Sequence, residues 1–228
     1  MHVIETKNIS KLYKQADQDI IALNDVSISF EKGEFTAIVG PSGSGKTTFL
    51  NSIGGLDSPT SGKVLIEKKE ITGLSSNELI DFRLKNIGFV FQSYNLIPVL
   101  TAKENVEFIM LMQGLSKLYR HKRSIELLNS VGLEDQLNRR PNQLSGGQQQ
   151  RVAVARALAS KPKFVLADEP TANLDSSSTA NLLDIMSKLN KTEKMTFIFS
   201  THDQRVIDRA NRIITLEDGK ILSDKKIK

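Results

Sequence analysis

At residues 40–47 the sequence reads Gly40-Pro41-Ser42-Gly43-Ser44-Gly45-Lys46-Thr47, which follows the pattern G-x-x-x-x-G-K-[ST] of a phosphate-binding loop. The short apolar run 35–39 before it is typical of a buried parallel strand, and residues 48–53 after it begin a helix. Because this order of strand, glycine-rich turn and helix is the context that the motif requires, the stretch predicts a nucleotide-binding α/β fold.

The parts of this loop have separate predicted roles. Glycines let the backbone turn tightly, so that the N–H groups at the start of the helix can point at an anion. Lys46 adds a positive charge near the β- and γ-phosphates, and the hydroxyl of Thr47 is placed to ligate Mg²⁺. We therefore expect the whole stretch from Gly40 to Thr47, with the adjoining Thr48, to hold a nucleoside triphosphate.

The composition is that of an ordinary globular protein. The chain has 228 residues, of which 39% are hydrophobic and 25% charged, which fits one domain or one domain with an inserted lobe. It contains no cysteine, which excludes disulfides and cysteine-ligated zinc or iron–sulfur sites. No signal-peptide pattern is present, and the longest apolar run, residues 108–112, is too short to span a bilayer. We expect that the chain does not cross a membrane by itself.

The net charge of +5 and the pI of about 9.3 are compatible with a nucleic acid or an anionic membrane as a partner. The charges are dispersed, however, and no arginine-rich stretch interleaved with aromatic residues is present. We therefore expect no nucleic-acid partner. The terminal Lys225-Lys226-Ile227-Lys228 is open to two interpretations, ordinary solvation or lipid contact, of which solvation is favoured.

Residues 1–33 alternate as strands do, in three runs: 3–6, 20–23 and 26–30. They predict an antiparallel sheet edge packed on the nucleotide core. Tyr13 lies in this part of the chain, and its ring can stack on a base. The alternative, a partly buried sheet tyrosine, is left open by the sequence.

Four apolar strand patterns are each followed by a residue that can bind a ligand. These residues are Gly40 after residues 35–39, Gln92 after 87–91, Asp168-Glu169 after 164–167 and His202 after 196–200. Because the carboxyl ends of parallel strands meet at one edge of a sheet, we expect these groups to gather at a ligand crevice. There Asp168 can hold Mg²⁺, Glu169 can polarise an attacking water, and Gln92 can orient water or contact the metal. His202 is predicted to contact phosphate.

Residues 93–160 differ from the rest of the chain, because strand patterns stop. The segments 102–115 and 122–131 carry apolar residues at helical spacing, which predicts a helical lobe inserted into the nucleotide core. The apolar loop 96–100 precedes them and either binds a partner or packs inside the lobe.

A second helix start with anion-binding features occurs at Leu144-Ser145-Gly146-Gly147-Gln148. It opens a helix predicted over residues 149–160, with Ser145 as the cap. One phosphate loop does not need a second such terminus. It binds either the same nucleotide from within the chain or the nucleotide of a second copy.

In this order, the motifs resemble those of the nucleotide-binding subunit of an ATP-binding-cassette (ABC) transporter. The matching positions are Tyr13, Gly40–Thr47, Gln92, Leu144–Gln148, Asp168-Glu169, Asn173-Leu174-Asp175 and His202. Residues 54–62, 89–98, 166–171 and 173–175 make the chain most similar to the lipoprotein-releasing and macrolide-export type. Ala172 departs from the glycine expected there in many members.

The resemblance implies a P-loop NTPase core with a mostly parallel sheet, an antiparallel N-terminal β subdomain and an inserted helical subdomain. The core is expected at about 1–92 and 161–228, and the helical subdomain at about 93–160. The implied activity is ATP hydrolysis with ATP and Mg²⁺ as cofactors. Glu169, His202 and Gln92 would be catalytic, and Thr47, Gln92 and Asp168 would organise the metal. Tyr13 would stack the adenine.

The resemblance also implies a head-to-tail pair, with each ATP between the phosphate loop of one copy and the signature residues of the other. Those signature residues are Ser145, Gly146, Gly147 and Gln148. A separate membrane permease would dock near residues 92–100 and the helical lobe, which places the chain at the cytoplasmic face of the membrane. Non-transport relatives that act in cell division, on DNA or on ribosomes are the alternative. The sequence contains neither sustained heptads nor a second phosphate loop, which favours transport.

Overall fold

The computed structural model describes residues 2–15 and 18–227. In chain order the elements are β1 (His2–Gln15), β2 (Gln18–Glu31), β3 (Phe35–Val39), α1 (Lys46–Ile53), β4 (Ser61–Ile66), β5 (Lys69–Glu70), α2 (Ser76–Asn86), β6 (Ile87–Val90), α3 (Ala102–Met112), α4 (Lys117–Ser130), α5 (Gly146–Ala159), β7 (Phe164–Asp168), α6 (Ser176–Glu193), β8 (Thr196–Ser200), α7 (Gln204–Ile207), β9 (Arg212–Glu217) and β10 (Lys220–Lys226). Two 3₁₀ turns, Glu134–Gln136 and Pro141–Gln143, connect α4 to α5.

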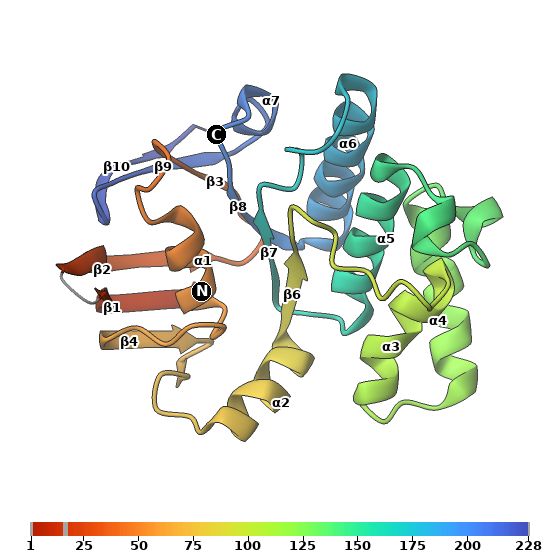
Figure 1. Cartoon of the computed structure of the whole chain (residues 1–228), viewed down its shortest axis with the longest axis horizontal. Helices are drawn as coiled ribbons and strands as arrows, with labels where there is room; N and C mark the ends of the chain where they lie inside the picture. The colour runs from red at the N-terminus through yellow and green to blue at the C-terminus, as the bar shows by residue number, and fades with distance from the viewer. Residues whose placement is uncertain (1, 16–17, 228) are drawn as a thin grey trace.

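The strands form two sheets (Figure 1). The first has the order β2-β1-β4-β5 and is antiparallel. The second has the order β10-β9-β3-β8-β7-β6, and among the described residues its strand pairs are parallel except for β10–β9. This confirms the predicted α/β fold with a mostly parallel core sheet and an antiparallel N-terminal sheet.

Alternate side chains of the central strands pack into two hydrophobic clusters, one on each face of the six-stranded sheet. In β7, Phe164 and Leu166 pack with α1 and the four-stranded sheet, whereas Val165 packs with the helices α3 to α6. In β8, Ile198 faces the first side and Phe199 the second. Successive side chains of a strand point to opposite faces, so strands buried on both faces read as continuous apolar runs. Figure 1 shows the helices α3, α4 and α5 gathered on one side of the molecule.

Helix starts follow side-chain caps. Ser75 and Thr101 each accept a hydrogen bond from the backbone N–H three residues later and begin α2 and α3. Ser116 caps α4 in the same way, so this helix begins at Lys117 and not at the predicted residue 122. A side-chain oxygen that satisfies an otherwise unpaired N–H fixes where a helix begins.

Two details of the strands differ from the prediction. The runs 20–23 and 26–30 belong to one strand, β2, because register shifts against β1 absorb the irregularity between them. The hairpin β9–β10 was not predicted. It includes Lys225 and Lys226 of the basic terminus, and Nζ of Lys226 lies 3.6 Å from Oε2 of Glu31. Lys228, which belongs to the same prediction, lies outside the described residues.

None of the helices within residues 2–15 and 18–227 combines the length and apolar character that a membrane crossing requires. The helices α3, α4 and α5 fall within the predicted lobe 93–160. Its division from the core as a separate subdomain remains a prediction.

Candidate functional site

The predicted phosphate loop connects β3 to α1. Gly45 occupies the N-cap of α1 with φ at 98°, and a Cβ added there would lie 2.3 Å from the carbonyl oxygen of Ala22. Both facts require glycine, because a side chain would meet backbone and would strain the left-handed conformation. The loop is therefore built so that its backbone N–H groups line the start of α1, which is a binding site for anions.

The side chains of Lys46 and Thr47 lie at the mouth of this loop. Nζ of Lys46 donates to the carbonyl oxygens of Gly40 and Pro41, each at 2.9 Å. An ammonium has three N–H donors, so this geometry leaves one of them for a phosphate oxygen. Oγ1 of Thr47 donates to Oδ1 of Asp168 at 3.1 Å. The fold thus joins two predicted metal ligands that lie far apart in the sequence.

Asp168 and Glu169 stand where β7 ends. Glu169 has a left-handed backbone, with φ at 45°, and its N–H donates to the carbonyl oxygen of Ser200 at 2.9 Å. Its Oε1 lies 2.8 Å from Nδ1 of His202. Its Oε2 is buried and has no hydrogen-bond partner among the described residues. A buried carboxylate oxygen without a partner is costly, and it is available to accept a proton from a water.

Glu169 and His202 also line a cleft of about 280 Å³, together with Thr171, Asp203 and Arg205. Oγ1 of Thr171 donates to Oδ2 of Asp203 at 2.8 Å. This bond ties the segment that follows Glu169 to the segment that follows His202. Thr171 and Asp203 were not among the predicted site residues, although both lie within two residues of one.

Gln92 and Tyr13 stand at the borders of the site. Gln92 is exposed, and its carbonyl oxygen accepts a hydrogen bond from Nδ2 of Asn173 at 3.1 Å. Tyr13 lies on β1 with 38% of its surface exposed, and its hydroxyl donates to Oδ2 of Asp57 at 2.6 Å. The ring of Tyr13 is thus accessible for stacking.

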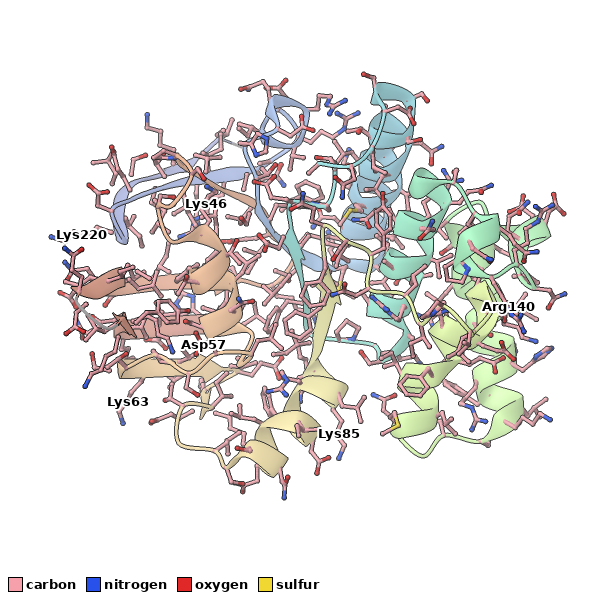
Figure 2. The ribbon with its side chains drawn as sticks, viewed as in Figure 1. Lys46, Asp57, Lys63, Lys85, Arg140 and Lys220 are labelled. Atoms are coloured by element: carbon pink, nitrogen blue, oxygen red, sulfur yellow. The ribbon has the colours of Figure 1, made fainter. Side chains whose placement is uncertain are left out.

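The second predicted anion-binding terminus begins α5. Ser145 caps this helix by accepting from the N–H of Gln148 at 3.2 Å, and Ser145 is exposed. A Cβ added to Gly147 would lie 2.6 Å from Oγ of Ser178 on α6, so only glycine lets the two helices approach this closely. Lys46 lies on the side of the four-stranded sheet, whereas α5 lies among the helices beyond β6 and β7 (Figures 1 and 2). One copy of the chain therefore does not bring the two termini together.

Two contacts of α5 with the rest of the site were missed by the sequence analysis. Nε2 of the fully buried Gln150 donates to the carbonyl oxygen of Pro170 at 2.8 Å. The guanidinium of Arg156 donates to the carbonyl oxygens of Tyr94 and Asn95. A glutamine and an arginine in a helix rich in alanine and valine were the available signal, because polar groups that become buried or half-buried need partners.

The donor set fits a magnesium nucleotide. Thr47 and Asp168 supply oxygen atoms, which Mg²⁺ prefers, and Mg²⁺ usually takes one or two protein ligands together with waters and phosphate oxygens. Within the described part of the chain, no three histidine, aspartate or glutamate side chains cluster as a metal site made of protein alone would require. The loop suits an anion, since the side chain of Ser44 is buried there and its Oγ has no partner among the described residues.

Comparison with known proteins gives a consistent result. The sequence model of the ABC transporter family matches residues 23–172. An uncharacterized ABC transporter ATP-binding protein of Methanocaldococcus jannaschii, MJ1508, is 48% identical over 96% of this chain and 98% of its own length. The macrolide export ATP-binding/permease protein MacB of Aggregatibacter actinomycetemcomitans is 45% identical over 98% of this chain, which spans 35% of MacB.

A solved structure has the same fold. The dimeric post-hydrolysis structure of the ATP-binding cassette MJ0796, bound to ADP and Pi, superposes with a TM-score of 0.92 at 45% identity and covers 99% of both chains. The family model covers the phosphate loop, the α5 terminus and the Asp168–Glu169 pair. The chain therefore belongs to the ABC transporter family, as an ATP-binding cassette that hydrolyses ATP.

Proposed function

We propose that this cassette works as a head-to-tail pair and powers a separate membrane permease of the lipoprotein-releasing or macrolide-export type. The observation that carries the proposal is the separation of its two anion-binding helix termini. The start of α1 carries the phosphate loop and the start of α5 carries Ser145–Gln148, on different sides of one chain (Figure 1). A second copy in the opposite orientation completes two nucleotide sites at once.

Each residue of the site then has one role. The amides of Gly43 and Gly45 and the side chain of Lys46 bind the phosphates, and Tyr13 stacks on the adenine. Mg²⁺, held by Thr47 and Asp168 with Gln92 nearby, would neutralise charge on the phosphates.

Hydrolysis depends on the pair at the ends of β7 and β8. Glu169 orients a water and accepts its proton, which suits the unpartnered Oε2, while His202 contacts the γ-phosphate and holds Oε1 of Glu169. Ser145–Gln148 of the second copy bind the same γ-phosphate. Loss of that phosphate removes the link between the copies, so that the pair opens.

The permease is expected to dock in an apolar groove. A groove of about 460 Å³ lies between α2 and β6 on one side and α3 and α5 on the other, with Phe89, Ile97, Phe108 and Met112 in its walls. Arg83 and Arg156 also line it. Apolar patches of this kind mark contact surfaces. The guanidinium of Arg83 uses Nη1 on the carbonyl oxygen of Gly55, and its other N–H donors suit an acidic residue on a cytoplasmic helix of the permease. This interaction would place the chain at the cytoplasmic face of the membrane as a peripheral subunit.

The relatives support this proposal by their printed functions. MacB is a macrolide exporter in which cassette and permease share one chain, and MJ0796 forms a dimer. None of the relatives reported above points to an ATPase that acts on DNA or ribosomes.

Purification of the tagged chain from detergent-solubilised membranes of its own cells tests the assignment. The expected result is co-purification of a permease with a large extracytoplasmic domain, which raises ATP turnover when it is added back. Recovery of ribosomes or DNA, with no permease, would show that the chain has a different partner.

A further inference from the structure

A three-residue cluster links β1 to the segment that follows α1. The carboxylate of Asp57 accepts hydrogen bonds from two residues of β1, from Nζ of Lys11 at 2.5 Å and from the hydroxyl of Tyr13 at 2.6 Å. Nζ of Lys11 also donates to the carbonyl oxygen of Ser58 at 2.7 Å. Asp57 is therefore fixed by Lys11 on one oxygen and holds Tyr13 with the other.

The same lysine restricts how the ring of Tyr13 can be used. Nζ of Lys11 lies 5.0 Å from the centre of the Tyr13 ring, over its face. A cation in this position is attracted by the ring. The Lys11 side chain is only 13% exposed, whereas Tyr13 is 38% exposed. A planar base that stacks on Tyr13 must therefore take the face opposite Lys11.

The cluster lies next to the phosphate loop. The helix α1 packs against β1, the strand of Tyr13, and the side chain of Thr48 in the first turn of α1 acts to lower the pKa of the Tyr13 hydroxyl. Figure 2 labels Asp57 and Lys46 on the same side of the molecule, the side of the four-stranded sheet. A base stacked on Tyr13 would thus stay within reach of a triphosphate bound at Lys46.

The protonation states required for these contacts are stable near neutral pH. Burial and the hydrogen bond to Asp57 both raise the pKa of Tyr13, so its hydroxyl remains a donor. Desolvation opposes ionisation of Asp57, but the hydrogen bonds from Lys11 and Tyr13 outweigh it and lower the pKa of this carboxyl. The carboxylate therefore remains an acceptor.

We propose that Asp57 is a positioning residue for adenine recognition, which, fixed by Lys11, holds the ring of Tyr13 in the orientation that stacks on the base. This inference rests on the proposed function, in which Tyr13 stacks on the adenine. In this role Asp57 would act through the ring of Tyr13 and would contact neither the base nor the phosphates. Its effect should depend on the base, because it acts only through the ring.

The test compares a ligand with the base and a ligand without it. Calorimetry on the intact chain measures the affinity for MgATP and for magnesium tripolyphosphate in Tyr13→Ala, Tyr13→Phe and Asp57→Asn. Glu70→Gln is the control, since it removes another surface carboxylate that pairs with a lysine, Lys63 at 2.9 Å, in the same sheet. ATPase assays give KM and kcat for each variant.

Tyr13→Ala should weaken MgATP by about tenfold or more, because it removes the stacking surface, and should leave tripolyphosphate unchanged. Asp57→Asn and Tyr13→Phe should each weaken MgATP by about threefold to tenfold, raise KM and leave kcat unchanged. The double variant Tyr13→Phe/Asp57→Asn should be no weaker than either single variant, since both remove one interaction. Glu70→Gln should match the unmodified chain.

The two ideas fail in different ways. If Tyr13→Ala binds MgATP normally, the stacking role in the proposed function is wrong. If Tyr13→Ala weakens MgATP but Asp57→Asn and Tyr13→Phe do not, or if Asp57→Asn weakens tripolyphosphate equally, the positioning role of Asp57 is wrong. Tyr13→Phe keeps the Asp57–Lys11 pair, so it decides the question even if Asp57→Asn does not fold.

Discussion

Nδ1 of His202 lies 2.8 Å from Oε1 of Glu169, although 33 residues separate them. The contact spans the ends of two adjacent parallel strands, β8 and β7. It fixes one carboxylate oxygen of Glu169 and leaves the other, Oε2, without a partner among the described residues. A general base must be held in place while one of its oxygens stays available to the water. The pair meets both requirements.

The first prediction concerns Glu169→Gln. An amide keeps the size of the side chain and its contact with His202 but cannot accept a proton from water, so ATP should bind and stay unhydrolysed. We expect turnover to fall by about a hundredfold or more and a stable dimer to accumulate with MgATP. Light scattering after gel filtration measures the dimer, and phosphate release measures turnover.

The matched control is Glu126→Gln, an exposed carboxylate on α4 whose side chain is 50% exposed. It should hydrolyse ATP at the unmodified rate and form no persistent dimer. Normal hydrolysis by Glu169→Gln would show that another group is the base.

The second prediction concerns Ser145→Arg. Ser145 is exposed at the start of α5, and a large cation there should block the approach of a second copy. We expect turnover to be abolished while the monomer still binds ATP at its own phosphate loop. Equilibrium binding of a fluorescent ATP analogue and phosphate release are measured on the same preparation.

Loss of a helix cap alone costs about 1 kcal/mol, so the control must reproduce that loss elsewhere. Ser116→Arg does so at the start of α4, where Ser116 caps in the same way. This control should remain active. A strictly monomeric preparation that hydrolyses ATP at full rate would contradict the shared-site arrangement.

The sequence predicted the fold well where local pattern and burial agree. The strands β7 and β8 are buried on both faces, and each contains an uninterrupted apolar run, Phe164–Ala167 and Phe197–Phe199. Such runs predict strands that are buried on both faces. The hairpin β9–β10 was missed because β10 reads Lys220-Ile221-Leu222-Ser223-Asp224-Lys225-Lys226, which is mostly polar. The hairpin also carries an ion-pair cluster that reaches a residue far away in the sequence. Arg212 bonds both Asp224 at 2.6 Å and Glu34 at 3.0 Å, and no local periodicity encodes such an ion pair.

The candidate site divides in the same way. The proximity of Thr47 and Asp168 could be predicted from the sequence. Both follow strands of one parallel sheet, and both are residue types that bind Mg²⁺. The hydrogen bond between Tyr13 and Asp57 could not be predicted, because Asp57 lies in a turn, where polar residues are common for local reasons. A contact with a backbone carbonyl, such as that of Gln150 with Pro170, also cannot be predicted from the sequence, because every residue type has a carbonyl oxygen that can accept.

The third prediction concerns Arg156, which joins α5 to the loop after Gln92. Its guanidinium donates to the carbonyl oxygens of Tyr94 and Asn95, and burial lowers its pKa, although an arginine stays charged. Lysine keeps the charge but loses the planar fork, so one carbonyl should lose its partner. We expect Arg156→Lys to lower the free energy of unfolding by about 1–2 kcal/mol.

Urea unfolding followed by circular dichroism measures this change. Arg209→Lys is the control, because Arg209 forms a more exposed pair with Asp184 at 3.0 Å, and exposed pairs contribute about 0–1 kcal/mol. An unfolding midpoint of Arg156→Lys equal to that of the control would show that the two carbonyl contacts add no stability.

The fourth prediction concerns pH and Asp203. Hydrogen bonds from Arg205, opposed in part by desolvation and aided by Thr171, lower the pKa of Asp203 from 3.8 to about 2. A carboxyl whose folded pKa is depressed stabilises the fold above its unfolded pKa, and this stability is lost as the pH falls through the folded pKa. Asp203→Asn should therefore be less stable than the unmodified chain at neutral pH, and the difference should shrink between about pH 4 and about pH 2.

Urea midpoints of the two proteins at about pH 7, 5 and 3 measure that difference. Asp184→Asn serves as the control, since the Asp184 side chain is 70% exposed and its pair with Arg209 is open to solvent. It should change the midpoint little at any pH. A gap between Asp203→Asn and the unmodified chain that stays constant down to about pH 3 would mean that the Thr171 and Arg205 contacts do not depend on the charge of Asp203. The tie between the Glu169 and His202 segments would then be a neutral hydrogen bond.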